Sequence, residues 1–260
     1  NPNLLTQFRK ELQNFILGTD GTDDESAVGC CMAALKILKL QGPLSLGLRL
    51  SAKVQNDRQL SSKNVRRLST ITNVFHRFSG QNNQFDAYVD YVLSMYQSPP
   101  SDVHSTVNEE TRMKGEELLE LGNVAKFRAD YSLAETRYKQ ALNQFVSIGH
   151  HQGIVNVHLR LGSVNIHKGE YGAARLDFEA AQKLANEQGF YLASIDAHLG
   201  SGKVLHCLGH TANALEELHR SLTLVGKVGD TFRENQILGI TARAYQDKGE
   251  YSKAARFFKG

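Results

Sequence analysis

The sequence predicts an all-α protein, in which an α-helical region precedes a right-handed solenoid of helical hairpins. The 260 residues include only 4 prolines and no tryptophan. Residues that favour helices, such as Ala, Leu, Glu, Lys and Gln, are frequent. Residues 106–260 also repeat with a period of 40. A helical hairpin that cannot bury its apolar face alone must stack on its neighbours, so this repeat predicts a solenoid.

The repeat consists of columns of similar residues 40 positions apart. A small residue opens each repeat, at Gly122, Gly162, Gly202 and Ala242. Seven residues on, a turn residue stands at Ala129, Gly169, Gly209 and Gly249. Twelve residues on, alanine recurs at Ala134, Ala174, Ala214 and Ala254. Sixteen residues on, a large residue stands at Tyr138, Phe178, Leu218 and Phe258.

Each column predicts a packing role in a helical hairpin. Small residues in the first and alanine columns let two antiparallel helices approach closely, and the large residue fills the space beside them. Glycine in the turn column permits the left-handed backbone that ends a helix. We therefore expect about four hairpins over residues 106–260, with the last one truncated.

The Gly-x-Tyr turn at Gly169 and Gly249, together with the small, alanine and aromatic columns, resembles the tetratricopeptide repeat family over about 114–260. The family's usual period is 34 residues. The period of 40 found here resembles a subgroup with longer helices, typified by Pins/LGN and rapsyn. The resemblance implies a non-catalytic adaptor in which the first helix of each repeat lines a concave groove. Family members bind extended partner segments in that groove.

The first hundred residues do not show these columns. They predict about five helices, over Asn3–Leu17, Ser26–Gln41, Leu44–Gln55, Ser62–Ser79 and Asn83–Tyr96. A polar loop precedes the second helix, and its acids are expected to cap that helix. A linker at residues 98–105 separates this region, residues 1–97, from the repeats. Two interpretations of residues 1–97 remain open, a separate helical domain and degenerate repeats that continue the solenoid.

Composition and motifs exclude several functional classes. No apolar run reaches the roughly 20 residues that a membrane span needs. The net charge of +3 is too small to predict a nucleic-acid-binding face. Three cysteines in an odd arrangement favour a reducing, cytoplasmic setting. The sequence contains no phosphate loop, nucleophile elbow or zinc motif, and Gly200-Ser201-Gly202-Lys203 falls inside a repeat helix. We therefore predict no enzyme, cofactor or metal.

Register along the predicted groove selects a stripe of polar and basic side chains. They are Asn123, Lys126, Asn156, Arg160, Ser163, Lys203, His206, Gln236 and Arg243. Asn, Lys and Arg suit the backbone and acidic side chains of a peptide, through charge-assisted hydrogen bonds. The expected partner is a protein or peptide segment that is extended and partly acidic. An ordinary polar face is the plainer interpretation of this stripe.

Two further predictions concern regulation. The repeats could instead form a regulatory or self-associating module, whose groove is filled in cis by another part of the same protein. Separately, Arg66-Arg67-Leu68-Ser69 matches a pattern that basophilic kinases recognise, which makes Ser69 a candidate phosphorylation site. Short patterns of this kind are common, and this one lies in a predicted amphipathic helix.

Overall fold

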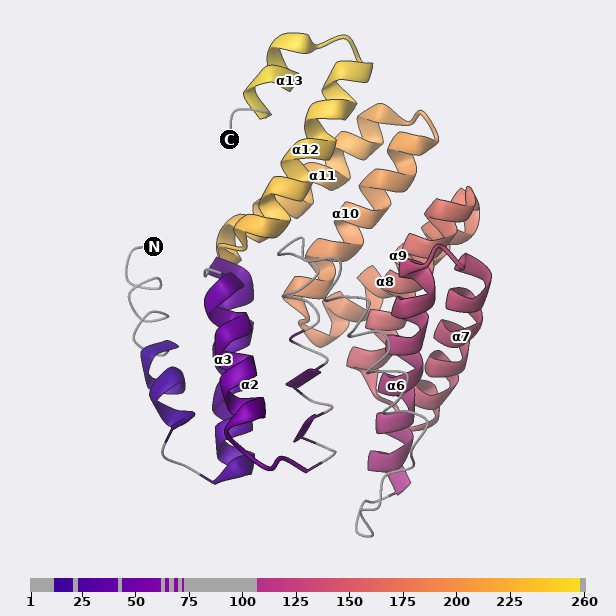
Figure 1. Ribbon diagram of the computed structural model, residues 1–260. Coiled ribbons are helices and arrows are strands. Elements are labelled where there is room, and N and C mark those ends of the chain that lie inside the picture. Colours follow the sequence, from indigo (N-terminus) through magenta and orange to yellow (C-terminus); the bar gives the residue numbers. More distant parts are fainter. Residues whose placement is uncertain are drawn as a thin grey trace. The chain divides into compact units, whose positions relative to one another are not determined.

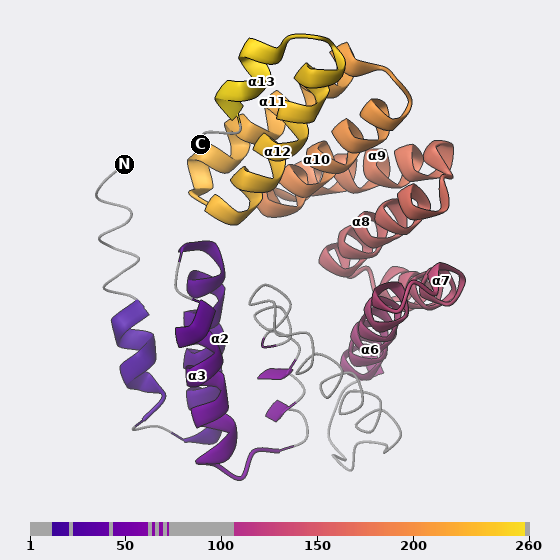
Figure 2. The same ribbon diagram turned by 45° about the horizontal axis from the view of Figure 1, so that its top comes forward.

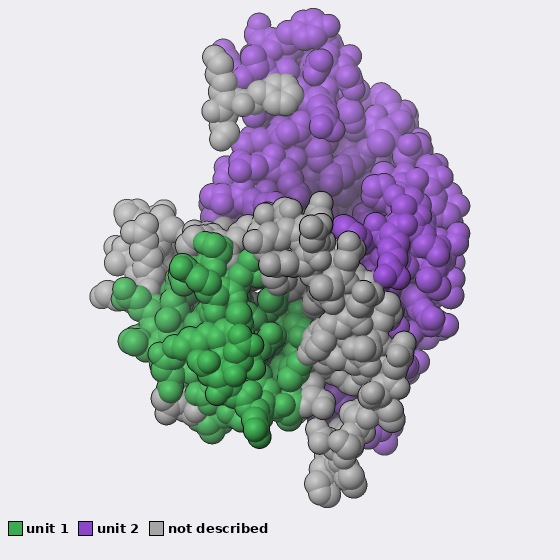
Figure 3. All heavy atoms as spheres, in the orientation of Figure 1, with its two compact units in different colours: residues 1–102 green, residues 103–260 purple. Residues whose placement is uncertain are grey.

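The computed structural model describes residues 12–20, 23–41, 44–61, 64–65, 68–69, 72 and 107–257 (Figure 1). The chain divides into two compact units, residues 1–102 and residues 103–260 (Figure 3). The boundary between the units falls within the linker predicted at 98–105.

The first unit is built around helices α2 (Asp24–Gln41) and α3 (Leu44–Asn56), which pack against each other. Asp23 caps α2, because its carboxylate accepts hydrogen bonds from the backbone N–H of Ser26 at 3.0 Å and from the Ser26 hydroxyl at 2.8 Å. The core of the unit consists of buried apolar side chains from both helices and from residue 68. They are Val28, Cys31, Ala34, Leu35, Leu38, Leu50, Val54 and Leu68.

Two of the five predicted amino-terminal helices, over Ser26–Gln41 and Leu44–Gln55, are confirmed within two residues. Residues 12–18 are also helical, inside the predicted helix Asn3–Leu17. The helix predicted over Ser62–Ser79 is only partly described, and the described positions 64–65, 68–69 and 72 are helical. The helix predicted over Asn83–Tyr96 lies outside the described residues.

The second unit confirms the predicted solenoid of helical hairpins. Its helices are α6 (Val107–Phe127), α7 (Tyr131–Ser147), α8 (His151–Lys168), α9 (Tyr171–Gln188), α10 (Tyr191–Cys207), α11 (Thr211–Val228), α12 (Thr231–Asp247) and α13 (Tyr251–Phe257). They pair as α6 with α7, α8 with α9, α10 with α11, and α12 with α13. We call α6, α8, α10 and α12 the inner helices, because Figure 2 shows them along the inside of the curve that this unit describes. The outer helices are α7, α9, α11 and α13.

Every connection between helices of this unit contains one residue with a left-handed backbone. These residues recur every 20 positions, at Ala129, Gly149, Gly169, Gly189, Gly209, Gly229 and Gly249. Their φ angles lie between 58° and 78°, a region that glycine enters without steric cost. The period of 40 seen in the sequence is therefore two equal half-periods, one for each helix of a hairpin.

The small residues that open the repeats lie directly against the large residues sixteen positions on. A Cβ atom added to Gly122 would lie 2.4 Å from Tyr138, and one added to Gly162 would lie 2.8 Å from Phe178. A Cβ atom at Gly202 would lie 2.8 Å from Leu218. All three distances are shorter than a van der Waals contact, so glycine is what allows each inner helix to meet its outer partner. This predicted packing role is confirmed.

None of the helices among the described residues is both long enough and apolar enough to span a bilayer.

Candidate functional site

All nine residues of the predicted binding stripe lie on inner helices. Asn123 and Lys126 belong to α6, and Asn156, Arg160 and Ser163 belong to α8. Lys203 and His206 belong to α10, and Gln236 and Arg243 belong to α12. We call the surface that these four helices form the inner face. The 40-residue register places the side chains at equivalent positions along it.

Four of the nine side chains form hydrogen bonds within the unit. Asn123 Oδ1 accepts a hydrogen bond of 2.8 Å from the hydroxyl of Tyr138, a buried residue of α7. Lys126 Nζ donates to Ser163 Oγ at 2.6 Å, which ties α6 to α8. His206 Nε2 donates to Asp247 Oδ2 at 2.7 Å, which ties α10 to the end of α12. These side chains therefore help to hold the solenoid together.

The other five stripe residues have no hydrogen bond or ion pair within the part of the chain that the structure describes. They are Asn156, Arg160, Lys203, Gln236 and Arg243. Arg160, Gln236 and Arg243 are exposed, whereas Asn156 and Lys203 are half-buried. Burial lowers the pKa of the Lys203 ammonium, and nearby Asp196 acts weakly against that change. Their role in binding a partner stays a prediction.

One acidic group near Lys203, Asp196, is paired with an arginine within the unit. Asp196 of α10 accepts two hydrogen bonds from the Arg233 guanidinium of α12, from Nε at 2.7 Å and from Nη2 at 2.9 Å. The same guanidinium also donates to Asp230, the N-cap residue of α12. Burial acts to lower the pKa of Arg233, but the hydrogen bonds and charges of Asp196 and Asp230 together outweigh it and raise that pKa above its usual range. Asp196 therefore adds little negative charge to the inner face.

One basic residue of the inner face was missed from the sequence. His167 lies in the last turn of α8, four residues after Ser163 and so on the same side of the helix. Its ring stacks on the ring of Tyr131, with centroids 5.1 Å apart and planes within 2° of parallel. Burial lowers the pKa of His167, and the charges of Lys126 and Lys203 lower it further. His167 was missed because it lies one position beyond the columns that register selects.

Two other histidines have structural partners in successive repeats. His158 Nδ1 donates to Asp177 Oδ1 at 3.0 Å, and His198 Nδ1 donates to Glu217 Oε2 at 2.7 Å. Both pairs join an inner helix to its outer partner, and they are 40 residues apart in the sequence. Across the described residues, no three His, Cys, Asp or Glu side chains gather as a metal site would require.

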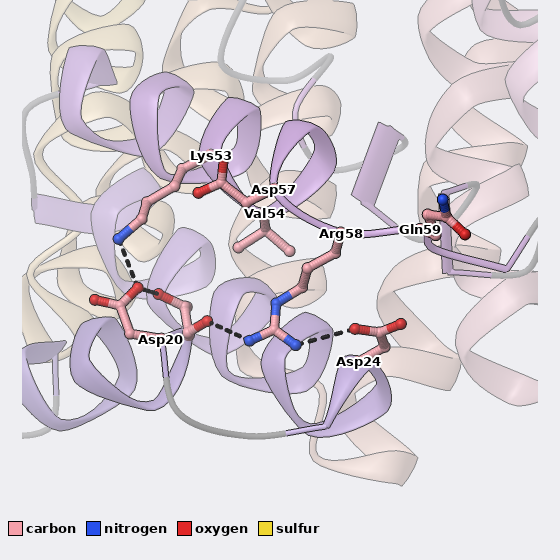
Figure 4. A pocket seen from close by; sticks show the side chains of 8 residues that line it. Asp20, Asp24, Lys53, Val54, Asp57, Arg58 and Gln59 are labelled. Carbon is pink, nitrogen blue, oxygen red and sulfur yellow. Dashed lines mark hydrogen bonds and ion pairs between the residues drawn. The ribbon is translucent and has the colours of Figure 1, made fainter.

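The first unit contains a separate polar cavity of about 410 Å³ (Figure 4). Lys53 Nζ lies 2.6 Å from Asp20 Oδ1, and Arg58 donates to Asp24 Oδ1 and to the carbonyl of Thr19, each at 3.0 Å. Four of the five charged side chains that line this cavity thus pair with one another, and the fifth is Asp57. Because most of these charges are used within the unit, the cavity has little charge left to offer a ligand.

The candidate phosphorylation site lies inside the first unit. Ser69 is buried, and only 5% of the residue is exposed. Arg66 and Arg67 lie outside the described residues. A kinase could reach Ser69 only if this part of the unit opened, so its phosphorylation stays a prediction.

Comparison with known proteins shows the fold. No protein-family model and no curated protein sequence matches the chain. Among solved structures, a Rap protein complexed with competence and sporulation factor has a TM-score of 0.68 at 11% identity, covering 98% of this chain and 75% of that one. Aspartyl phosphate phosphatase F from Bacillus subtilis has a TM-score of 0.57 at 10% identity, covering 96% and 72%.

Two further solved structures have a similar fold. The Rap conjugation regulator of plasmid pLS20, solved in complex with the Phr* peptide, has a TM-score of 0.53 at 14% identity, covering 89% of this chain and 62% of that one. A tetratricopeptide repeat protein from Parabacteroides merdae has a TM-score of 0.53 at 13% identity, covering 98% and 91%. The fold is thus that of tetratricopeptide-like proteins. The resemblance to the Pins/LGN and rapsyn subgroup stays a prediction.

Proposed function

We propose that this protein is a non-catalytic adaptor, whose inner face binds an extended and partly acidic segment of a partner protein. The observation that carries the proposal is the row of unpaired polar and basic side chains on successive inner helices. Arg160, Lys203 and Arg243 each come from a different inner helix, and none forms a hydrogen bond or ion pair with a described residue. A row of this kind suits a chain of carboxylates and peptide groups that runs across the helices.

Two observations support this choice of surface. The carboxylate of Asp196 is held by Arg233 at 2.7 Å, so it does not neutralise the row. A structure of similar fold, the pLS20 regulator, was solved in complex with a peptide. Because that likeness rests on 14% identity, it supports peptide binding as a class and no particular residue of this chain.

The test is affinity capture from a cell extract with a charge-reversed inner face, in which Arg160, Lys203 and Arg243 are all changed to Glu. We expect the wild-type protein to recover a partner that this variant does not recover. The matched control reverses three cations on outer helices, Arg137→Glu, Lys183→Glu and Lys227→Glu, and should recover the partner as the wild type does. Circular dichroism should show equal helicity for all three proteins.

The remaining outcomes point elsewhere. Equal recovery by the wild type and by the inner-face variant would overturn the proposed site and move it to the outer helices or the first unit. A wild type that recovers no partner but associates with itself would favour the alternative, in which another part of the same protein fills the inner face. Sedimentation of the purified chain at several concentrations separates these results.

A further inference from the structure

Lys203 is the most unusual cation of the inner face, because it is half-buried and makes no hydrogen bond or ion pair with any described residue. A partly desolvated ammonium without a partner is costly for a protein to hold. By contrast, Lys126 on α6 donates from Nζ to Ser163 Oγ at 2.6 Å. The two lysines therefore differ in what the neighbouring inner helix provides.

The repeat register explains the difference. Ser163, Lys203 and Arg243 are equivalent positions, as are Lys126, Ile166 and His206. At the step from α6 to α8, Lys126 bonds to Ser163. At the step from α8 to α10, the equivalent positions hold Ile166 and Lys203, and an isoleucine side chain cannot accept a hydrogen bond. The aliphatic neighbour can pack against the stem of Lys203, but it leaves the ammonium unmatched.

The surroundings of Lys203 add positive charge. His167, next to Ile166, is close enough to both Lys126 and Lys203 that their charges lower its pKa, after the larger effect of burial. These three basic groups come from three consecutive inner helices, α6, α8 and α10. The acid that acts on Lys203 is Asp196, and both of its oxygens are held by Arg233. Basic groups of α6, α8 and α10 thus lie near one another, and among them Lys203 forms no hydrogen bond or ion pair with a described residue.

We infer that Lys203, with His167 and Lys126 beside it, forms a subsite for one carboxylate side chain, Asp or Glu, of the bound partner segment. The inference rests on the proposed function, and it places the preference of the inner face for acidic segments at Lys203. The Lys203 ammonium supplies a charge-assisted hydrogen bond to the carboxylate. Lys126 stays on Ser163 and contributes its charge, and His167 is held in position by the ring of Tyr131.

This arrangement also predicts how binding depends on pH. A carboxylate placed beside His167 favours the charged imidazole, so the pKa of His167 is higher in the complex than in the free protein. The cations facing His167 are Lys126 from α6 and Lys203 from α10, with the neutral Tyr131 ring from α7. Affinity for a carboxylate should therefore rise as the pH falls from 8 to 6, a range in which Glu stays ionised.

The experiment is an NMR titration of the whole chain with two capped peptides, acetyl-Glu-Glu-Glu-amide and acetyl-Gln-Gln-Gln-amide. We expect the glutamate peptide to shift the side-chain signals of Lys203 and His167, and the glutamine peptide to leave them in place. Lys203→Met keeps the aliphatic stem but removes the charge, and it should weaken binding of the glutamate peptide about tenfold. Lys203→Arg should retain most of the affinity, and Lys183→Met, on an outer helix, should match the wild type.

Three results would overturn the inference. In the first, the glutamate peptide binds Lys203→Met with wild-type affinity, as measured by the shifts of inner-helix amide signals. That result would remove the subsite but leave the proposed function standing. Another is the absence of any response of Lys203 and His167 to the glutamate peptide. The third is an equal response to sodium chloride at matched ionic strength, because that would be charge screening alone. The capture experiment decides the proposed function separately, so the two failures are distinguishable.

Discussion

Single residues at the turns decide how much strain the solenoid carries. Six of the seven left-handed turn positions are glycine, and the exception is Ala129, with a φ of 58°. A left-handed conformation costs a residue with a Cβ atom roughly 1–2 kcal/mol. The turn between α6 and α7 therefore holds a strain that the later turns avoid.

Ala129→Gly should stabilise the repeat unit. Relief of the left-handed strain exceeds the extra chain entropy that glycine loses on folding, which leaves a net gain of roughly 0.5–1 kcal/mol. The reverse change at the equivalent position, Gly169→Ala, should destabilise the unit by a similar amount. Urea unfolding of both variants measures the free energies. A loss of stability in Ala129→Gly would show that the turn is not strained.

Gly162→Ala should destabilise the repeat unit through overpacking. Its new Cβ atom would meet the Phe178 ring at 2.8 Å, and forcing the hairpin apart costs roughly 1–3 kcal/mol. Gly172→Ala is the matched control, because Gly172 also lies in a helix but has no atom within 4 Å of the added Cβ. Its helix propensity should make that variant equal to or more stable than the wild type. Equal losses in the two variants would argue against overpacking.

His150 links the stability of the repeat unit to pH. Its Nδ1 accepts a hydrogen bond of 3.1 Å from the backbone N–H of Gly153 and so caps α8. Burial lowers the pKa of His150 from its usual 6.5. The folded protein therefore prefers the neutral ring, and this contribution to stability is lost as the pH falls below about 6.5. Protonated Nδ1 cannot accept the capping bond.

His150→Asn should remove part of this pH dependence, because Asn caps a helix without titrating in this range. We expect the free energy of unfolding to fall less steeply between pH 7.5 and 5 in His150→Asn than in the wild type. His151→Asn changes the exposed histidine next to it and should keep the wild-type slope. An unchanged slope in His150→Asn would exclude His150 as the linked group.

At the scale of the element, each middle hairpin is joined by a histidine–carboxylate pair. The His198–Glu217 pair links α10 to α11 at 2.7 Å, and it is only 10% and 16% exposed at the two side chains. The hydrogen bond from His198 lowers the pKa of Glu217, so the pair contributes stability above the usual pKa of 4.5 and loses it in more acidic solution. The pair thus adds a polar contact between α10 and α11 to the packing of Gly202 on Leu218.

A double-mutant cycle with His198→Gln and Glu217→Gln should measure how much this pair contributes to the free energy of unfolding. We expect a coupling free energy of roughly 1 kcal/mol at neutral pH, because the pair is largely shielded from water. The control cycle uses Lys139→Gln and Glu135→Gln, a pair on α7 whose lysine is 64% exposed. Its coupling should stay near roughly 0.3–0.5 kcal/mol. Equal coupling free energies in both cycles would show that shielding from water does not strengthen the His198–Glu217 pair.

At the scale of the whole molecule, the sequence predicted what recurs and missed what does not. The turns, the small columns and the large residues recur every 40 positions, so the packing of Gly122 on Tyr138 could be predicted from register alone. The bonds of Asn123 to Tyr138 and of His206 to Asp247 occur once each. Such bonds depend on the rotamers of single side chains, which register does not specify, and they engage two residues of the predicted stripe, Asn123 and His206, within the unit.

Because the left-handed turns are equally spaced, a segment of one full period can be removed and the flanking helices can still meet at an equivalent turn. Excising residues 171–210 would splice Glu170 to Thr211, so that α8 meets α11 in a hybrid hairpin. Gly162 would then face Leu218, as Gly202 does, and His158 would stand opposite Glu217. A shortened, folded chain should result. Excising the half-period 151–170 would instead set two outer helices in succession, and α9 would lose α8, the inner helix of its own hairpin, while keeping its contact with α10.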